Sequence, residues 1–160
     1  MALGESRQVF ETIVDQKVSG VSERGGIMSY VPYAVGLVAY ANAAAISGAL
    51  VNPAGLMLGD IEALNYWLHP EYRQRNVDPQ GSVVALASEG QFFTDFVETT
   101  LAGITVGTYA PGDVLYLADD GKVSRNNGTF GNAGTAIRKV VGKALDSLGS
   151  DGFLKVDINL

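Results

Sequence analysis

Two turn signals enclose a short apolar segment, and together they constrain the fold more than any other feature of the sequence. Pro111-Gly112 suits the two central positions of a type II turn, because proline fixes φ and glycine tolerates a positive φ. Asp120-Gly121 suits a type I′ turn, which joins adjacent antiparallel strands. The sequence therefore predicts a strand between the two turns and a second strand after Gly121, paired as a hairpin.

The last residues of the sequence alternate between apolar and polar side chains. In "FLKVDINL", Leu154, Val156 and Ile158 fall on one side, together with Leu160, and the residues between them are polar. A period of two is typical of a strand with one buried face. The preceding segment "AIRKVVGKAL" is also predicted to be a strand, in which Gly142 indicates a bulge or a close backbone approach.

Further strands are predicted from residue 82 onward. "VVALAS" and "QFFTDFVET" are separated by Glu89-Gly90 and are expected to form a hairpin, and "GITVGTY" is another short strand. Phe92 and Phe93 point to opposite faces of their strand, which predicts burial on both sides, one against the core and one against a subunit. The strand lengths and turn spacing favour a mainly β fold, a small β-sandwich or barrel.

Residues 1–26 differ from the rest of the chain. Val9, Phe10, Ile13 and Val14 fall near a helical spacing, and Gly20, Gly25 and Gly26 follow like a hinge. We therefore divide the chain into residues 1–26, an N-terminal arm or helix, and residues 27–160, a β-rich domain. The segment is either an arm that orders on a partner or an ordinary helix packed on its own domain. In the first case these four apolar residues make the partner contacts.

No charged residue occurs between Gly25 and Gly59. A membrane span needs about 20 mostly apolar residues, but this stretch holds several polar residues and prolines, so we favour buried core or a subunit interface. Such an apolar surface predicts an oligomer, a homotrimer, with Tyr30, Tyr33 and Tyr40 at its interface. The next segment predicts a short helix that begins near Asp60 and stops before Pro70.

Composition limits the classes of function. The chain has no cysteine, a net charge of −6 and no basic block. Disulfides and thiolate-bound metals are therefore excluded, and a nucleic-acid partner is not expected, since phosphate binding needs clustered Lys and Arg. Only 18% of the residues are charged, fewer than the usual quarter. This favours a protein that buries surface against partners as well as within itself.

No catalytic, cofactor or metal site is predicted. His69 is the only histidine, and no nucleophile motif accompanies it. Asp60, Glu62, His69 and Glu71 match no familiar metal-ligand spacing. The glycine-rich "NNGTFGNAG" precedes a predicted strand, whereas a phosphate loop needs a helix N-terminus there. These residues are expected to be helix-end charges and a surface loop.

The segments "YAPGDVLYLADDGKVS" and "VVGKALDSLGSDGFLKVDINL" lie in the C-terminal half. They resemble the capsid decoration (cement) proteins of tailed bacteriophages, and the resemblance covers about residues 83–160. The matching positions are Gly112, Asp113, Leu115, Tyr116, Leu117, Gly121, Val141, Gly142, Ala144, Leu145, Gly152, Leu154, Val156 and Ile158. The resemblance implies a β-tulip or jelly-roll-like domain, with an N-terminal arm and a short helix beside it.

The resemblance also implies a function. Such a protein is not an enzyme; it lies on the outer capsid surface of the virion, binds the major capsid protein and resists the pressure of packaged DNA. We expect a homotrimer without cofactor, nucleic acid or membrane partner. Two alternatives remain open: a tail-fibre, baseplate or host-recognition β module, and a hydrolase domain that uses His69. The copy number per virion distinguishes a decoration protein, with hundreds of copies, from a tail module, with few. A His69→Ala variant with unchanged properties would count against the hydrolase domain.

Overall fold

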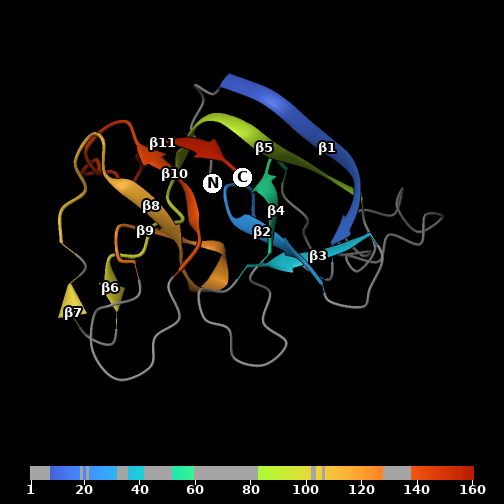
Figure 1. Cartoon of the computed structure of the whole chain (residues 1–160), viewed down its shortest axis with the longest axis horizontal. Coiled ribbons are helices and arrows are strands. Elements are labelled where there is room, and N and C mark those ends of the chain that lie inside the picture. Colours follow the sequence, from blue (N-terminus) through green and yellow to red (C-terminus); the bar gives the residue numbers. More distant parts are fainter. Residues whose placement is uncertain are drawn as a thin grey trace, which may run out of the picture.

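The fold is mainly β, as the sequence predicts. It is seen in a computed structural model that describes residues 8–18, 20, 22–31, 36–41, 52–59, 83–101, 104–105, 107–127 and 138–160. The strands are β1 (Gln8–Val18), β2 (Ile27–Tyr30), β3 (Leu37–Tyr40), β4 (Pro53–Met57), β5 (Val83–Thr94), β6 (Thr100–Leu101), β7 (Ile104–Thr105), β8 (Val114–Leu117), β9 (Val123–Ser124), β10 (Val140–Ala144) and β11 (Leu154–Asn159). One short 3-10 segment, η2 (Asp119–Gly121), joins β8 to β9 (Figure 1).

Five strands close into a small barrel. Their order is β1-β3-β2-β4-β5, and β5 returns to pair with β1. All neighbours are antiparallel except β1 and β3, which run parallel. The barrel interior is filled by one cluster of buried side chains: Val18, Met28, Val38, Ala54, Met57, Val84 and Leu86. Closure removes the free sheet edges that would otherwise invite pairing with other chains.

The second half of β5 leaves the barrel and begins another sheet, which we call the curled sheet. It continues in the order β5-β11-β10-β8-β9. The segment after β5 turns back to β9: the Val123 N–H donates to the Phe96 carbonyl (N···O 2.9 Å), and the Glu98 N–H donates to the Val123 carbonyl (2.8 Å). The curled sheet therefore closes on the extension of its own first strand. A separate hairpin, β6 with β7, follows that extension.

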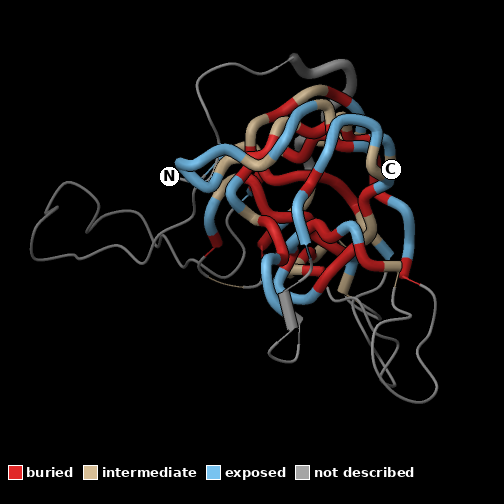
Figure 2. Tube along the Cα trace, turned by 90° about the vertical axis from the view of Figure 1, so that its left-hand side faces the viewer, coloured by how far each residue is buried: buried red, intermediate tan, exposed pale blue. Residues whose placement is uncertain are grey.

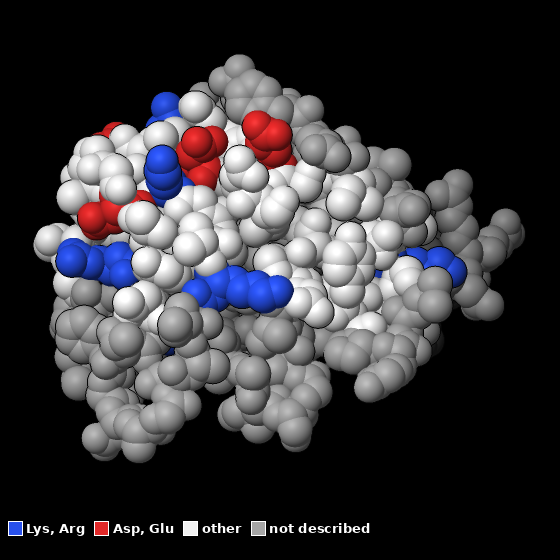
Figure 3. Space-filling view, viewed as in Figure 1, with Lys and Arg blue, Asp and Glu red and all other residues white. Residues whose placement is uncertain are grey.

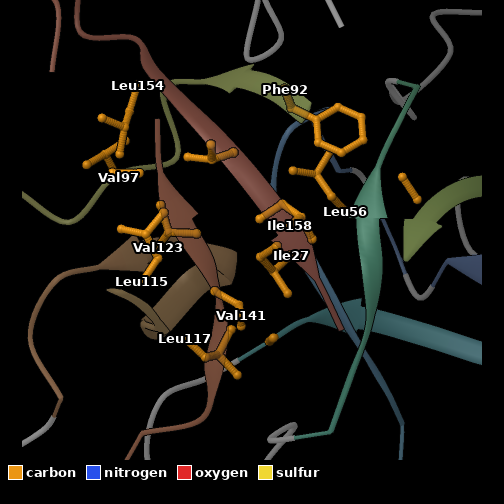
Figure 4. Packing of buried hydrophobic residues seen from close by; sticks show 14 of the residues in the cluster. Ile27, Leu56, Phe92, Val97, Leu115, Leu117, Val123, Val141, Leu154 and Ile158 are labelled. Atoms are coloured by element: carbon orange, nitrogen blue, oxygen red, sulfur yellow. The ribbon is translucent and has the colours of Figure 1, made fainter. Parts of the chain in front are cut away.

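A second apolar cluster lies between the two halves. Ile27 and Leu56 contribute to it from the outer faces of barrel strands, and Phe92, Val141 and Ile158 contribute from the curled sheet (Figure 4). Strands β2 and β4 are thus buried on both faces, because Met28 and Met57 point into the barrel. Figure 2 shows the resulting continuous buried interior with exposed backbone at the periphery.

Two described parts of the charge-free stretch are core, as one of the two favoured interpretations predicts. Residues 25–29 and 54–57 are buried within the chain itself. Both faces of these strands meet apolar side chains, which leaves no place for a charge. No helix among the described residues is long and apolar enough to span a membrane. Since residues 25–29 and 54–57 are covered internally, their apolar character does not by itself require an oligomer.

Residues 8–18 correct the prediction of a helix near the N-terminus. They form β1, an 11-residue strand that pairs with β5 along most of its length. The apolar spacing that suggests a helix instead accompanies a strand with several register shifts, which disturb the period of two. Residues 8–18 therefore belong to the same sheet as β2 to β5. The helix predicted from Asp60 lies outside the described residues.

Val83–Thr94 corrects the predicted hairpin at Glu89-Gly90. It is one strand, β5, and Gly90 lies in its interior with a φ of 153°. Gly90 is paired with Val9 on one side and with Ile158 on the other. Two flanking strands hold this position extended, so the chain does not reverse there. The glycine instead marks the place where β5 passes from the barrel to the curled sheet.

The turns predicted at Pro111-Gly112 and Asp120-Gly121 are both confirmed. Gly112 has a φ of 91°, and the Asp113 N–H donates to the Ala110 carbonyl (N···O 3.1 Å), as a type II turn requires. Asp120 and Gly121 have φ values of 57° and 73°, which define the type I′ turn. Any side chain at Gly121 would also meet the Ile27 backbone, since an added Cβ lies 2.8 Å from the Ile27 carbonyl oxygen.

The close backbone approach predicted at Gly142 is also confirmed. A Cβ at this position would lie 2.0 Å from the Asp157 carbonyl oxygen of β11. A register irregularity between Val140 and Gly142 accompanies it on the side of β8. The last strand has the predicted alternation, with Leu154, Val156 and Ile158 fully buried. The curled sheet is therefore held by close packing at positions that the sequence marks.

Candidate functional site

A buried ion pair is the most distinctive polar feature of the described residues. The Arg138 guanidinium donates twice to the Glu98 carboxylate, with Nη1···Oε2 at 2.6 Å and Nη2···Oε1 at 3.2 Å. Glu98 and Arg138 are both only 7% exposed. Such a bidentate pair offsets the free-energy cost of removing the two charges from water. It links the extension of β5 to the first residues before β10.

Tyr109 completes this buried cluster. Its hydroxyl donates to the Glu98 carbonyl oxygen (O···O 2.6 Å), so the backbone and the side chain of Glu98 are both engaged. Burial raises the pKa of the Tyr109 hydroxyl from 10.0 to about 12, because the phenolate would lose its hydration. Tyr109 is therefore held as a neutral donor throughout the physiological pH range.

Neighbouring backbone contacts extend the cluster. The Arg138 N–H donates to the Asn127 carbonyl (N···O 3.1 Å), and the Arg125 guanidinium donates to the Thr108 carbonyl. These bonds fasten the chain on both sides of residues 128–137. Because Glu98, Tyr109 and Arg138 are all buried, the cluster holds parts of the curled sheet together.

A surface strip of five exposed residues and the half-buried Tyr116 crosses the junction between the barrel and the curled sheet, and we call it the seam strip. It consists of Tyr30, Asn52, Val114, Tyr116, Lys139 and Val140. Asn52 joins the two halves: its carbonyl accepts from the Tyr30 N–H (3.2 Å), and its side-chain oxygen accepts from the Lys139 ammonium (2.7 Å). Val140 follows Lys139 in the chain and is directly opposite Tyr116 in the sheet.

The seam strip holds three of the four large apolar side chains that are exposed among the described residues. Tyr30 is 42% exposed, Val114 38% and Val140 57%, and the fourth is Val83 at the start of β5. Figure 3 shows one face of the molecule, where most of the described surface is uncharged and the charged side chains stand in small separate groups. Exposed apolar side chains gathered in one place are typical of a protein contact.

The residues expected to bind a partner through the N-terminal segment all lie on β1. Val9, Phe10 and Val14 are strand residues whose backbone alone the structure describes. Ile13 is half-buried and packs against the barrel interior, so it makes a contact within its own chain. The predicted role of these four residues in binding stays a prediction.

The three tyrosines expected at an oligomer interface lie in different surroundings. Tyr30 is exposed in the seam strip. Tyr40 packs against the barrel interior, its ring lies 5.6 Å from the Phe96 ring, and its hydroxyl accepts from the Glu23 N–H (2.5 Å). Tyr33 lies outside the described residues. Of the three, Tyr30 is therefore the one that the structure describes as available on the surface.

The residues considered for catalysis or metal binding fall outside the described part of the chain. This applies to His69, Asp60, Glu62 and Glu71, and to most of the glycine-rich loop. Within the described ranges, no three His, Asp or Glu side chains gather as metal ligands would. The arrangement that is described can hold a fold together and present a surface to another protein.

Comparison with known proteins gives no match: no family model, no curated protein and no solved structure is similar to this chain. Sequence reasoning missed both the Glu98–Arg138 pair and the seam strip. The pair joins residues 40 positions apart, a separation that no local pattern reveals. The strip depends on which faces of β8 and β10 remain uncovered, and this is known only once the barrel is in place.

Proposed function

We propose that this chain is a capsid decoration protein of a tailed bacteriophage. In this role it is a non-enzymatic structural protein of the virion, bound to the outer surface of the major capsid protein shell. It stabilises the shell against the pressure of packaged DNA. It acts as a homotrimer, with protein partners alone and without a cofactor, nucleic acid or membrane.

The observation that carries the proposal is the location of the residues that resemble this family. Gly112 and Gly121 occupy the positive-φ turns, and Gly142 occupies the close approach between β10 and β11. The apolar motif positions share one buried cluster: Leu115, Leu117, Val141, Ala144, Leu154, Val156 and Ile158. These motif positions thus pack against one another, together with Ile27 and Leu56 of the barrel strands. This supports a resemblance in fold to the decoration proteins. The binding role is argued separately, from the surface of the molecule.

The seam strip is the surface that we assign to the capsid. It is exposed and largely uncharged, and it spans both halves of the molecule. The apolar residues of β1 are less suited to this contact, because Ile13 packs into the barrel interior. A weak contact suffices, since many identical copies on a lattice reinforce one another.

Binding to capsids tests the proposal directly. Purified protein is added to DNA-filled shells that lack it, and the bound copies per particle are measured by mass spectrometry. We expect saturation at hundreds of copies and less DNA loss on heating or osmotic shock. Saturation at a few copies would instead indicate the tail-fibre or baseplate alternative, and no binding would contradict both.

Two exposed valines provide a matched pair of variants. Val140 in the seam strip is 57% exposed, and Val83 at the start of β5 is 59% exposed. Val140→Asp should weaken shell binding by about tenfold or more, the cost of losing a central apolar contact of roughly 1.4 kcal/mol. Val83→Asp introduces the same charge at equal exposure and should leave binding unchanged. Equal effects of the two would remove the seam strip from the contact.

A further inference from the structure

The two neighbours of β5 are paired with it very differently. On one edge, β11 forms six successive residue pairs, from Leu154 opposite Thr94 to Asn159 opposite Glu89, without a register shift. On the other edge, β1 forms seven pairs that are interrupted by three shifts, after Val9, Glu11 and Ile13. Each irregularity leaves backbone groups out of the ladder and bends the strand. The fit of β1 to β5 is therefore the poorer of the two.

Strand β3, the second neighbour of β1, adds little to the pairing that holds β1 in the barrel. It pairs with β3 at only two positions, Lys17 opposite Leu37 and Val18 opposite Val38. Among the described side chains of β1, Val18 is fully buried, whereas Ile13 is half-buried. Most of the strand thus depends on its irregular ladder with β5.

The chain that follows β1 is held from Ser22 onward but has open space at Gly20. Ser22 is buried, and the Glu23 N–H donates to the Tyr40 hydroxyl (2.5 Å). The Gly25 N–H donates to the Met57 carbonyl (2.8 Å), and the Thr94 hydroxyl donates to the Gly25 carbonyl (3.0 Å). At Gly20, by contrast, an added Cβ would meet no atom within 4 Å. A change in chain direction near Gly20 therefore leaves the contacts of residues 22–25 intact.

We propose that β1 is exchanged between copies of this chain, so that the β1 of one copy completes the barrel of another. Removal of β1 would uncover the edge of β5 and the interior side chains Met28 and Met57. A second copy supplies an identical strand, which pairs with β5 and β3 just as the chain's own β1 does. Exchange of an identical terminal element is a route to oligomers that needs no new interface.

The geometry limits how the copies are arranged. The connecting residues 19–21 span roughly 10 Å when extended, at about 3.3 Å per residue. The end of an exchanged β1 must lie within this reach of its own Ser22. Barrels that exchange β1 are therefore in close contact.

Engineered disulfides test the exchange, because the natural chain contains no cysteine. Lys17 of β1 is directly opposite Val83 of β5, and both side chains are exposed. Residues directly opposite on antiparallel strands are close enough for a disulfide. Lys17→Cys with Val83→Cys therefore links β1 to whichever β5 it pairs with. Val114→Cys with Lys143→Cys is the control, since these exposed, opposed residues join β8 to β10, which do not exchange.

Each variant is equilibrated at a series of concentrations, oxidised, and run on a denaturing gel without reductant. We expect the Lys17/Val83 pair to give covalent multimers whose ratio to monomer rises with concentration, while the control pair gives covalent monomers throughout. Covalent monomers from both pairs at every concentration would overturn the proposal. So would a Lys17/Val83 variant that is oxidised as a monomer at high dilution and still oligomerises when concentrated. The readout does not use capsids, so the exchange of β1 is tested independently of the proposed function.

Discussion

The barrel and the curled sheet share β5 but are stabilised in different ways. The curled sheet has tight turns of defined type, a regular β5–β11 ladder and a buried ion pair that fastens its extension to β10. The barrel has a parallel pairing of two residues and a first strand with three register shifts. In the curled sheet, local sequence signals and regular strand pairing therefore coincide. The barrel depends instead on closure of its strands around an apolar interior. Consistency between local and global preferences is what gives a segment a unique structure.

The largest expected effect concerns the core of the curled sheet. Val156→Asp places a charge among fully buried apolar side chains and should lower the free energy of unfolding by at least about 4 kcal/mol. Asn159→Asp is the control, since Asn159 lies on the same strand and is exposed. Urea denaturation followed by circular dichroism measures both. A Val156→Asp variant as stable as the natural chain would contradict the assignment of β11.

Breaking the ion pair should weaken the same half by a slightly smaller amount. Arg138→Met leaves the Glu98 carboxylate buried without its partner and should cost about 3–4 kcal/mol. The double variant Arg138→Met with Glu98→Gln removes the stranded charge and should recover part of this loss. A double-mutant cycle in urea determines the coupling. If the two single losses simply add, Glu98 and Arg138 do not act as one buried unit.

The raised pKa of Tyr109 predicts a loss of stability in alkali. The unfolded chain ionises this hydroxyl near pH 10 and the folded chain near pH 12. Below pH 10 the two states bind the same proton, whereas between pH 10 and 12 the unfolded state releases it more readily. The free energy of unfolding should therefore fall by about 2 kcal/mol over this window because of Tyr109 alone. Tyr109→Phe should show a shallower decline, and parallel pH profiles would contradict the assignment.

The last comparison concerns the two edges of β5, and the smallest expected effect is that of the variant on β1. Ile158 of β11 is fully buried, whereas Ile13 of β1 is half-buried. Ile158→Ala should cost about 3–4 kcal/mol and Ile13→Ala about 1 kcal/mol. Hydrogen exchange should likewise be faster for the amides of β1 than for those of β11. Equal losses and equal protection would mean that the irregular register of β1 has no energetic consequence.

The sequence predicts the curled sheet better than the barrel, and the reason is physical. Gly112 and Gly121 have the positive φ values of tight turns, a requirement that acts within a few residues, and the alternation of the last strand is undisturbed. The strand Gln8–Val18 resembles a helix in sequence because its bulges break the period of two. Gly90 suggests a turn, but its extended conformation is imposed by β1 and β11, which lie far away in sequence.

The candidate site was less accessible to sequence reasoning than the fold. Tyr30 was expected at a contact surface and is exposed, but Tyr40, of the same type and in the same stretch, packs inward. The register of β2 and β3 puts both on the same face of the sheet, with Tyr40 opposite Met28 and Tyr30 opposite Val38. They differ in position, since Tyr30 is the last residue of β2, and a pattern of residue types does not show where the cover of a strand ends. Val114 and Val140 attract no notice in the sequence, because valine in a strand usually predicts core.

The position of β5 also determines how the chain can be divided. The resemblance to decoration proteins begins at about residue 83, which is the first residue of β5. A fragment cut there takes the shared strand with it, so the remaining barrel retains four strands and an open side. The excised fragment in turn lacks Ile27 and Leu56, which cover its apolar cluster. Neither fragment is a self-sufficient module: a gene rearrangement at this boundary would yield two incomplete products that regain a core only by reassembling with each other.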